Sequence, residues 1–336
     1  MQSTIKDIKK ETGLALSTIS KYLNGGNVRP ENKRKIDEAV KKLDYHPNEM
    51  ARGLITRKTR TIGFVLYDVS GRFGGVLIRY VGAFLRQHGY SMIICDSSND
   101  KELETQNIKF LVEKKVDGIL LLPVAQDDAF LEPAKKAGIP VITIDRSISG
   151  AHYDCVTIDN VSAAKYAVDY LIERGHKKIA AIYSDGYTGK LRRDGYRKAM
   201  KEAQIKIPKQ YEYHETLYSV SLGYNGMKKF LELSVEERPT AVFMSNYEIA
   251  LGAVTAINEA GITCPDELSL VSFDELTLTF VMKPKMTVME QPMESIASEA
   301  VRIMMSRLGK EKQSTMQRVL LYATLSEGDS VRDLRK

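Results

Sequence analysis

Short apolar runs rich in β-branched residues alternate with longer helix-like stretches from residue 61 onward. The strand-like runs are Ile62–Tyr67, Met92–Cys95, Gly118–Leu122, Val141–Ile144, Val156–Ile158, Ile179–Tyr183, Ala241–Met244 and Leu268–Phe273. Helical stretches lie between them, at about 75–88, 102–115, 161–174, 190–203 and 246–260. Buried runs that alternate with helices predict βαβ units and parallel sheets. Because about 270 residues exceed what one sheet needs, we expect two similar α/β lobes.

The composition excludes several classes of protein. Apolar residues make up 43% of the chain and charged residues 27%, which is typical of a globular protein and not of long disorder. The three cysteines, Cys95, Cys155 and Cys264, are scattered, which favours a reducing compartment over a disulfide framework or a zinc site. The first residues contain no apolar signal segment, and no apolar run could span a bilayer. We therefore expect a cytoplasmic protein without a membrane partner.

The positive charge is concentrated at the N-terminal end. The first 60 residues contain 14 of the 49 lysines and arginines but only 7 of the 43 acidic residues. This segment therefore carries a net charge of +7, against +6 for the whole chain and −1 for the remainder. A basic module on a near-neutral body favours a partner such as nucleic acid, although a solvated basic surface would show the same balance.

The N-terminal segment has the pattern of a helix-turn-helix. Thr4 and Asp7 form a capping-box pair at the start of a first helix, which Gly13 ends. A second helix is predicted at about Leu16–Leu23, and a third begins near Pro30. The second helix would enter the DNA major groove. A small helical bundle without a DNA function would show a similar pattern.

A short helix and a basic linker are predicted after the third helix. Pro47 begins a helix that is too short to be stable alone, and several basic residues follow it. Such a helix could fold on DNA and insert an apolar wedge into the minor groove. An ordinary charged interdomain linker is the alternative.

Four motifs together carry a resemblance to a known family. Thr4–Ile8, Ser17–Lys21, Leu23–Gly25 and Tyr45–Asn48 resemble the DNA-binding head of the lactose-repressor (LacI/GalR) family, and the resemblance continues over essentially the whole chain. It implies a homodimer whose two heads read a pseudo-palindromic operator, with Leu54 as the minor-groove wedge. The residues that it assigns to DNA binding are Thr4, Leu16, Ser17, Thr18, Ser20, Lys21, Asn24, Asn48, Arg52 and Leu54.

The head departs from the family pattern at two positions. Ala15 replaces the serine that usually caps the second helix, which costs about 1 kcal/mol of local helix stability. Lys21 stands where arginine is more usual, and lysine lacks the planar fork that binds a guanine edge.

The resemblance also implies the organisation of the rest of the chain. It predicts a small all-α head at 1–46, a hinge helix and linker at 47–60, and an α/β core at 61–336. The core consists of two doubly wound parallel-sheet lobes of the periplasmic-binding-protein type, and the chain crosses between them three times. The expected lobe boundaries are about 61–160 with 293–321, and about 161–292 with 322–336.

A cleft at the carboxyl ends of the strands is the expected effector site. The residues that the resemblance places there are Tyr67, Arg72, Phe73, Asp145, Thr188, Arg192, Tyr218, Asn246, Asp274 and Gln291. Acidic and amide groups would bind sugar hydroxyls, an arginine would clamp them, and aromatic rings would cover the apolar ring face. A polar residue at a strand end is equally often a helix cap.

The expected cleft also departs from the family pattern. Tyr67, Gly71-Arg72, Gly74 and Tyr247 replace the usual residues. An arginine and a phenol at a helix N-terminus would suit an anionic or strongly hydrogen-bonding ligand, unless Arg72 is only a solvated loop residue.

Catalytic motifs are absent or incomplete. Gly186–Lys190 lacks the spacing of a phosphate loop, and the histidines form no metal-binding pattern. We therefore expect no cofactor, no metal and no enzymatic activity. The preferred interpretation is a sugar-responsive dimeric transcriptional repressor. One alternative is a regulator controlled by a phosphocarrier protein, and another is an enzyme or a transport-type binding protein.

Overall fold

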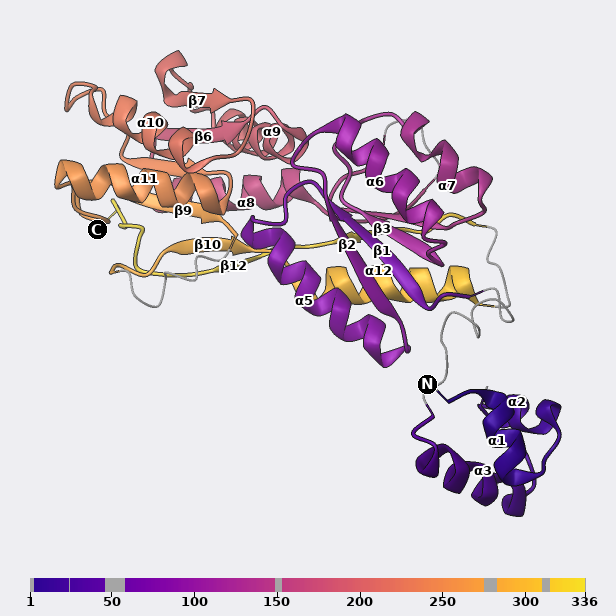
Figure 1. Cartoon of the computed structure of the whole chain (residues 1–336). Coiled ribbons are helices and arrows are strands. Elements are labelled where there is room, and N and C mark those ends of the chain that lie inside the picture. Colours follow the sequence, from indigo (N-terminus) through magenta and orange to yellow (C-terminus); the bar gives the residue numbers. More distant parts are fainter. Residues whose placement is uncertain are drawn as a thin grey trace.

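A computed structural model describes residues 3–23, 25–45, 58–148, 153–274, 283–309 and 315–335 (Figure 1). Three helices form the N-terminal head: α1 (Ile5–Thr12), α2 (Leu16–Leu23) and α3 (Pro30–Lys42). The predicted capping box is present, because Oδ2 of Asp7 accepts hydrogen bonds from the backbone N–H and the hydroxyl of Thr4 at 2.9 and 2.7 Å. Gly13 ends α1 in the left-handed conformation, with φ of 65°.

A small apolar core closes the head. Ile8 of α1, Ile19 of α2, and Ile36 and Ala39 of α3 are buried against one another. Their helical spacing places each on the inner face of its helix, which leaves the polar residues of α2 outside. The predicted helix-turn-helix is therefore confirmed.

The first lobe contains a six-stranded parallel sheet. Its order is β11-β5-β4-β3-β1-β2. The strands are β1 (Thr61–Leu66), β2 (Ser91–Asp96), β3 (Gly118–Leu121), β4 (Val141–Ile144), β5 (Asp154–Ile158) and β11 (Arg318–Leu321). Helices α5 (Arg72–Gln87) and α12 (Met293–Leu308) cover one face, and α6 (Lys101–Glu113) and α7 (Glu132–Lys136) cover the other (Figure 1). Because both faces are covered, β1 is a continuous apolar run.

The second lobe repeats this plan. Its sheet has the order β12-β10-β9-β8-β6-β7, in which only β12 is antiparallel. The strands are β6 (Ile179–Ser184), β7 (Glu212–Glu215), β8 (Ala241–Met244), β9 (Ser269–Phe273), β10 (Thr287–Glu290) and β12 (Thr324–Ser326). The covering helices are α8 (Asn160–Glu173) and α9 (Tyr187–Glu202) on one face, and α10 (Val220–Leu231) and α11 (Tyr247–Ala260) on the other.

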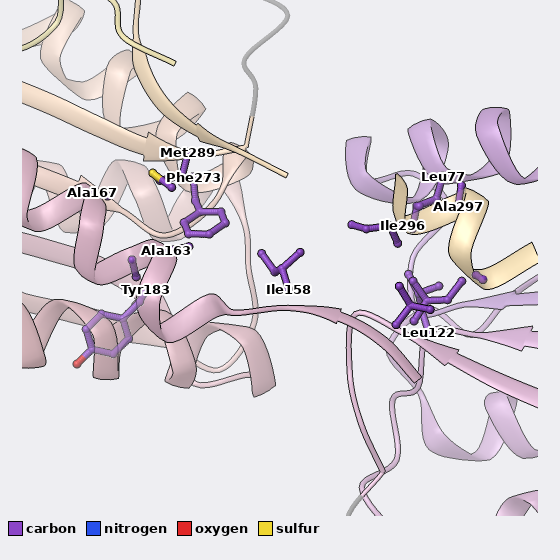
Figure 2. Packing of buried hydrophobic residues seen from close by; sticks show 14 of the residues in the cluster. Leu77, Leu122, Ile158, Ala163, Ala167, Tyr183, Phe273, Met289, Ile296 and Ala297 are labelled. Carbon is purple, nitrogen blue, oxygen red and sulfur yellow. The ribbon is translucent and has the colours of Figure 1, made fainter. Parts of the chain in front are cut away.

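The chain passes between the two sheets three times, after Ile158, Glu290 and Leu321. At the first of these points the apolar core is continuous. Figure 2 shows Ile158 between side chains of the first lobe, such as Leu77, and those of the second, such as Phe273. Among the described residues, no helix is both long and apolar enough to cross a membrane.

Candidate functional site

A cavity of about 220 Å³ lies between the lobes, at the carboxyl ends of strands from both sheets. Most side chains on its wall follow β1 and β4 in the first lobe, and β6, β7, β8, β9 and β10 in the second. The structure brings all ten of the expected effector residues to this wall: Tyr67, Arg72, Phe73, Asp145, Thr188, Arg192, Tyr218, Asn246, Asp274 and Gln291.

Arg192 is held rigidly by the core of the second lobe. Its side chain lies on α9 and is almost completely buried. Nε donates a hydrogen bond to Oδ1 of Asn160 at 2.8 Å, and Nη1 donates to the backbone carbonyl of Ser245 at 2.6 Å. The guanidinium group lies 3.6 Å from the centre of the Phe273 ring and 3.6 Å from the Asp274 carboxylate. The arginine is therefore preorganised before any ligand arrives.

Two aspartates occupy corresponding positions in the lobes. Asp145 follows β4 and Asp274 follows β9, and both adopt the left-handed backbone conformation, with φ of 69° and 71°. A non-glycine residue adopts this conformation at an energetic cost, and such strain is concentrated at functional sites. Oδ1 of Asp274 accepts a hydrogen bond from Gln291 at 2.5 Å. The buried Oε1 of Gln291 has no hydrogen-bond partner among the described residues, so it remains an acceptor beside the cavity.

Asp145 belongs to a buried group in the first lobe. Its carboxylate lies 3.5 Å from Nε of Arg146, whose guanidinium lies 4.0 Å from the centre of the Tyr67 ring. Burial raises the pKa of Asp145, while the positive charges of Arg146 and Arg192 act in the opposite direction. Burial also raises the pKa of Tyr67, so its phenol stays protonated and can donate a hydrogen bond.

Asn246 has a structural role as well as a place in the cavity. Its Oδ1 caps α11 by accepting a hydrogen bond from the backbone N–H of Ile249 at 3.0 Å, and its Nδ2 donates to Glu248 at 2.5 Å. Asn246 therefore acts as a helix cap, which was the alternative interpretation of a polar residue at a strand end. Nearby, the hydroxyl groups of Thr188 and Tyr218 lie 2.8 Å apart and form a hydrogen bond.

Sequence reasoning missed three carboxylates of the cavity wall, Asp68, Glu248 and Glu290. Burial raises the pKa of Glu248, and the negative charges of Asp274 and Asp68 raise it further. Asp68 and Glu248 each directly follow a position that the sequence marked as unusual, Tyr67 or Tyr247, and Glu290 directly precedes the predicted Gln291. That adjacency is the signal that could have found them.

The predicted DNA-binding residues fall into two groups. Leu16, Ser17 and Lys21 are exposed on α2, whereas Thr18 and Ser20 are half-buried. Ser17, Thr18 and Lys21 line a shallow groove with Asn27, Val28, Arg29 and Asn32. The hydroxyl of Thr4 binds Asp7. The other predicted residues, Asn24, Asn48, Arg52 and Leu54, lie outside the described residues, as does the predicted hinge helix.

Comparisons with known proteins identify the family. Residues 4–48 match the model of bacterial regulatory proteins of the lacI family, and residues 168–331 match a periplasmic binding protein-like domain. Catabolite control protein A of Priestia megaterium is 31% identical over 93% of this chain and 94% of its own length. The chain belongs to the lacI family. This lacI-family chain is a DNA-binding transcription regulator and not an enzyme, as the incomplete catalytic motifs predicted.

Solved structures of lacI-family proteins have the same fold. The lac repressor dimer bound to operator and the anti-inducer ONPF matches with a TM-score of 0.86 and 20% identity, over 99% of this chain and 100% of that one. A lacI-family regulator from Enterococcus faecium with bound ribose matches with a TM-score of 0.73 and 25% identity, over 82% of this chain and 99% of that one. The predicted fold, a helix-turn-helix head with two periplasmic-binding-protein-like lobes, is therefore confirmed.

Proposed function

We propose that this protein represses transcription as a homodimer on a pseudo-palindromic operator, and that a small sugar or sugar derivative controls its operator affinity. The observation that carries the proposal is the cavity between the lobes, on whose wall all ten expected effector residues meet. A ligand there would touch both lobes at once.

The chemistry of the wall supports a polyhydroxylated ligand. Arg192 offers donors, Asp145 and Asp274 offer acceptors, and Asn246 offers both. Phe73 supplies an apolar surface for a sugar ring. The volume of about 220 Å³ is below the roughly 300–1,000 Å³ of drug-sized sites, which favours one sugar ring. The Enterococcus faecium regulator was solved with bound ribose, a sugar of one ring, which supports a ligand of this size.

Control of DNA binding follows from the position of the cavity. A ligand that binds one relative orientation of the lobes better than another shifts their equilibrium toward it. The predicted hinge at 47–60 joins the first lobe to the head. We infer that a change in lobe orientation alters the spacing of the two heads in the dimer, and with it the affinity for both half-sites.

The test uses the full-length protein and operator DNA selected from a random library. Thermal unfolding is measured with a panel of monosaccharides, disaccharides and sugar phosphates, because a ligand at 100 times its Kd adds about 2.7 kcal/mol of stability. We expect one monosaccharide class to stabilise the protein and to change operator affinity. Stabilisation by a phosphocarrier protein, with none by any sugar, would replace this proposal with the protein-corepressor alternative.

A further inference from the structure

Two side-chain contacts join the lobes away from the three chain crossovers. In the first contact, the hydroxyl groups of Ser147 and Tyr187 lie 2.8 Å apart and form a hydrogen bond. Ser147 follows β4 of the first lobe, and Tyr187 is the first residue of α9 in the second lobe. Their chain neighbours Arg146 and Gly186 line the cavity, so this hydrogen bond lies at its border.

The second contact is made by the first residue of α11. The ring centre of Tyr247 lies 5.8 Å from the guanidinium group of Arg72, which is the first residue of α5 in the first lobe. A guanidinium group within about 6 Å of an aromatic ring centre is attracted to the ring. The starts of these two helices are close, because a Cβ atom built on Gly71 would lie 3.8 Å from Oε1 of Glu248. Both Arg72 and Tyr247 line the cavity.

The two tyrosines occupy corresponding positions in the second lobe. Tyr187 follows β6 and Tyr247 follows β8, and each is the first residue of the next helix. Their partners in the first lobe follow β4 and β1, which β3 separates in the sheet. The lobes are therefore joined at two separate places along the sheet edges that border the cavity.

Separation of the lobes about the crossovers would break both contacts, because each contact has one partner in either lobe. A hydrogen bond between protein groups changes such an equilibrium by about two- to tenfold. A cation–π contact at an exposed site changes it by about two- to fivefold. The two contacts together therefore favour the joined arrangement by about four- to fiftyfold.

We propose that Tyr187 and Tyr247 hold the lobes in a closed arrangement, in which both contacts are made, and so determine the balance between closed and open lobes before any effector acts. The contacts are between protein groups alone, so this balance does not depend on the chemistry of the effector. The inference therefore goes beyond the proposed function and can fail or succeed separately from it. An effector shifts the balance from the starting point that these contacts define.

The test measures the distance across the cavity in the full-length protein, in buffer without sugar. Spin labels are attached to Asn99→Cys in the first lobe and Leu217→Cys in the second, at exposed residues of the cavity wall. Cys264→Ser removes the half-buried cysteine, whereas Cys95 and Cys155 are buried and react slowly. Pulsed electron paramagnetic resonance gives the populations of short and long distances. Excess unlabelled protein ensures that only distances within one chain are measured.

Substitutions on both sides of the first contact should have the same effect. Ser147→Ala and Tyr187→Phe should each raise the ratio of long to short distances about two- to tenfold. The double variant should raise the ratio no further than either single variant, because all three remove the same hydrogen bond. Tyr247→Leu should raise the ratio about two- to fivefold, and its effect should multiply with that of Tyr187→Phe, because the two contacts are separate.

Tyr166→Phe is the matched control for the loss of a tyrosine hydroxyl. Tyr166 is 56% exposed on α8 and does not line the cavity, so this variant should leave the ratio unchanged. A second measurement needs no spin label. The chain contains no tryptophan, so the emission of Phe73→Trp comes from the cavity wall alone, and acrylamide should quench it more strongly in the same contact variants.

Two results would overturn the inference. An unchanged ratio in Ser147→Ala and Tyr187→Phe, with unchanged quenching, would show that the hydrogen bond does not hold the lobes together. Effects of these two substitutions that multiply in the double variant would show that they act separately and not through a shared contact between the lobes.

Discussion

Arg192 illustrates how one side chain connects the core of a lobe to the cavity. Three of its contacts, with Asn160, the Ser245 carbonyl and the Phe273 ring, belong to the second lobe itself. Only a planar guanidinium can make the two hydrogen bonds and the ring contact together. Its position near Asp274 is consequently determined by the fold.

Replacing Arg192 with lysine keeps the positive charge and removes the planar guanidinium group with its several donors. We expect ligand affinity to fall about ten- to hundredfold, because a charge-assisted hydrogen bond contributes about 1.5–3 kcal/mol. Titration calorimetry with the sugar found by the thermal screen measures this change. Arg193→Lys, beside it on α9, is the control, since Arg193 pairs with the adjacent Asp194 at 2.7 Å. Equal losses in both variants would contradict the role of Arg192.

His176 makes stability depend on pH. Its ring is buried, with Nδ1 2.9 Å from the Thr240 hydroxyl and Nε2 3.1 Å from the Arg332 carbonyl. Burial lowers its pKa, so the folded chain holds the ring neutral. The unfolded chain binds a proton below about pH 6.5. The stabilisation is therefore complete above that pH and is lost as the pH falls toward the lowered native pKa.

The measurement is the melting temperature between about pH 5 and pH 8. The unmodified protein should lose stability at the acidic end, and His176→Gln should lose less. His88→Gln, at an exposed position, should retain the full dependence. A His176→Gln curve parallel to that of the unmodified protein would assign the acid sensitivity to other groups.

At the scale of elements, apolar runs predicted most of the inner strands and the edge strand β2, but they missed the inner strand β10 and three edge strands. Val141–Ile144 and Ala241–Met244 are the observed β4 and β8, because strands covered on both faces are apolar throughout. The edge strand β7 has the sequence EYHE and is only partly buried, so no apolar run marked it. Strands β10, β11 and β12 and helices α7, α10 and α12 were also missed, although α12 has helical periodicity.

The resemblance placed ten residues at the cavity wall, where the structure brings them together, and their binding of an effector stays a prediction. Residues that follow parallel strands meet at one edge of their own sheet, and the cavity lies between these edges of the two sheets, so Asp145 after β4 and Asp274 after β9 both line it. Asn160 escaped prediction because its role depends on Arg192, a residue on another helix. A contact between helices leaves no periodic signal in the sequence.

An ion pair joins three elements of the first lobe. Arg307 of α12 donates to both carboxylate oxygens of Asp154 in β5 at 2.6 Å, and the backbone N–H of Gln317, before β11, donates to Asp154 at 2.7 Å. Asp154 is buried, so Asp154→Ala removes the carboxylate that joins Arg307 to the backbone of Gln317, while Arg307 keeps its hydrogen bond to the Thr315 carbonyl. We expect the free energy of unfolding in urea to fall by about 3–5 kcal/mol.

The control for this prediction is Glu299→Gln. Glu299 pairs with Arg302 at 2.8 Å on the surface of α12, where such a pair contributes at most about 1 kcal/mol. Similar losses in Asp154→Ala and Glu299→Gln would mean that the buried pair contributes no more than a surface pair.

At the scale of the whole molecule, charge and cavity are separated along the chain. The first 60 residues carry a net charge of +7, whereas the residues that line the cavity lie between 67 and 293. The residues that we propose for DNA binding and those that we propose for ligand binding therefore do not overlap. They can influence each other only through the lobes and the segment that joins them to the head.

This separation makes a quantitative prediction, because coupling between two sites is reciprocal. If the sugar changes operator affinity by a given factor, typically about 5- to 150-fold, the operator must change sugar affinity by the same factor. Operator affinity is measured by fluorescence anisotropy with and without saturating sugar, and sugar affinity by calorimetry with and without saturating operator. Both pairs of affinity measurements need the same salt concentration, because DNA affinity falls steeply as the salt concentration rises. Unequal factors would show that the sugar also binds outside the cavity, or that the dimer dissociates during one of the titrations.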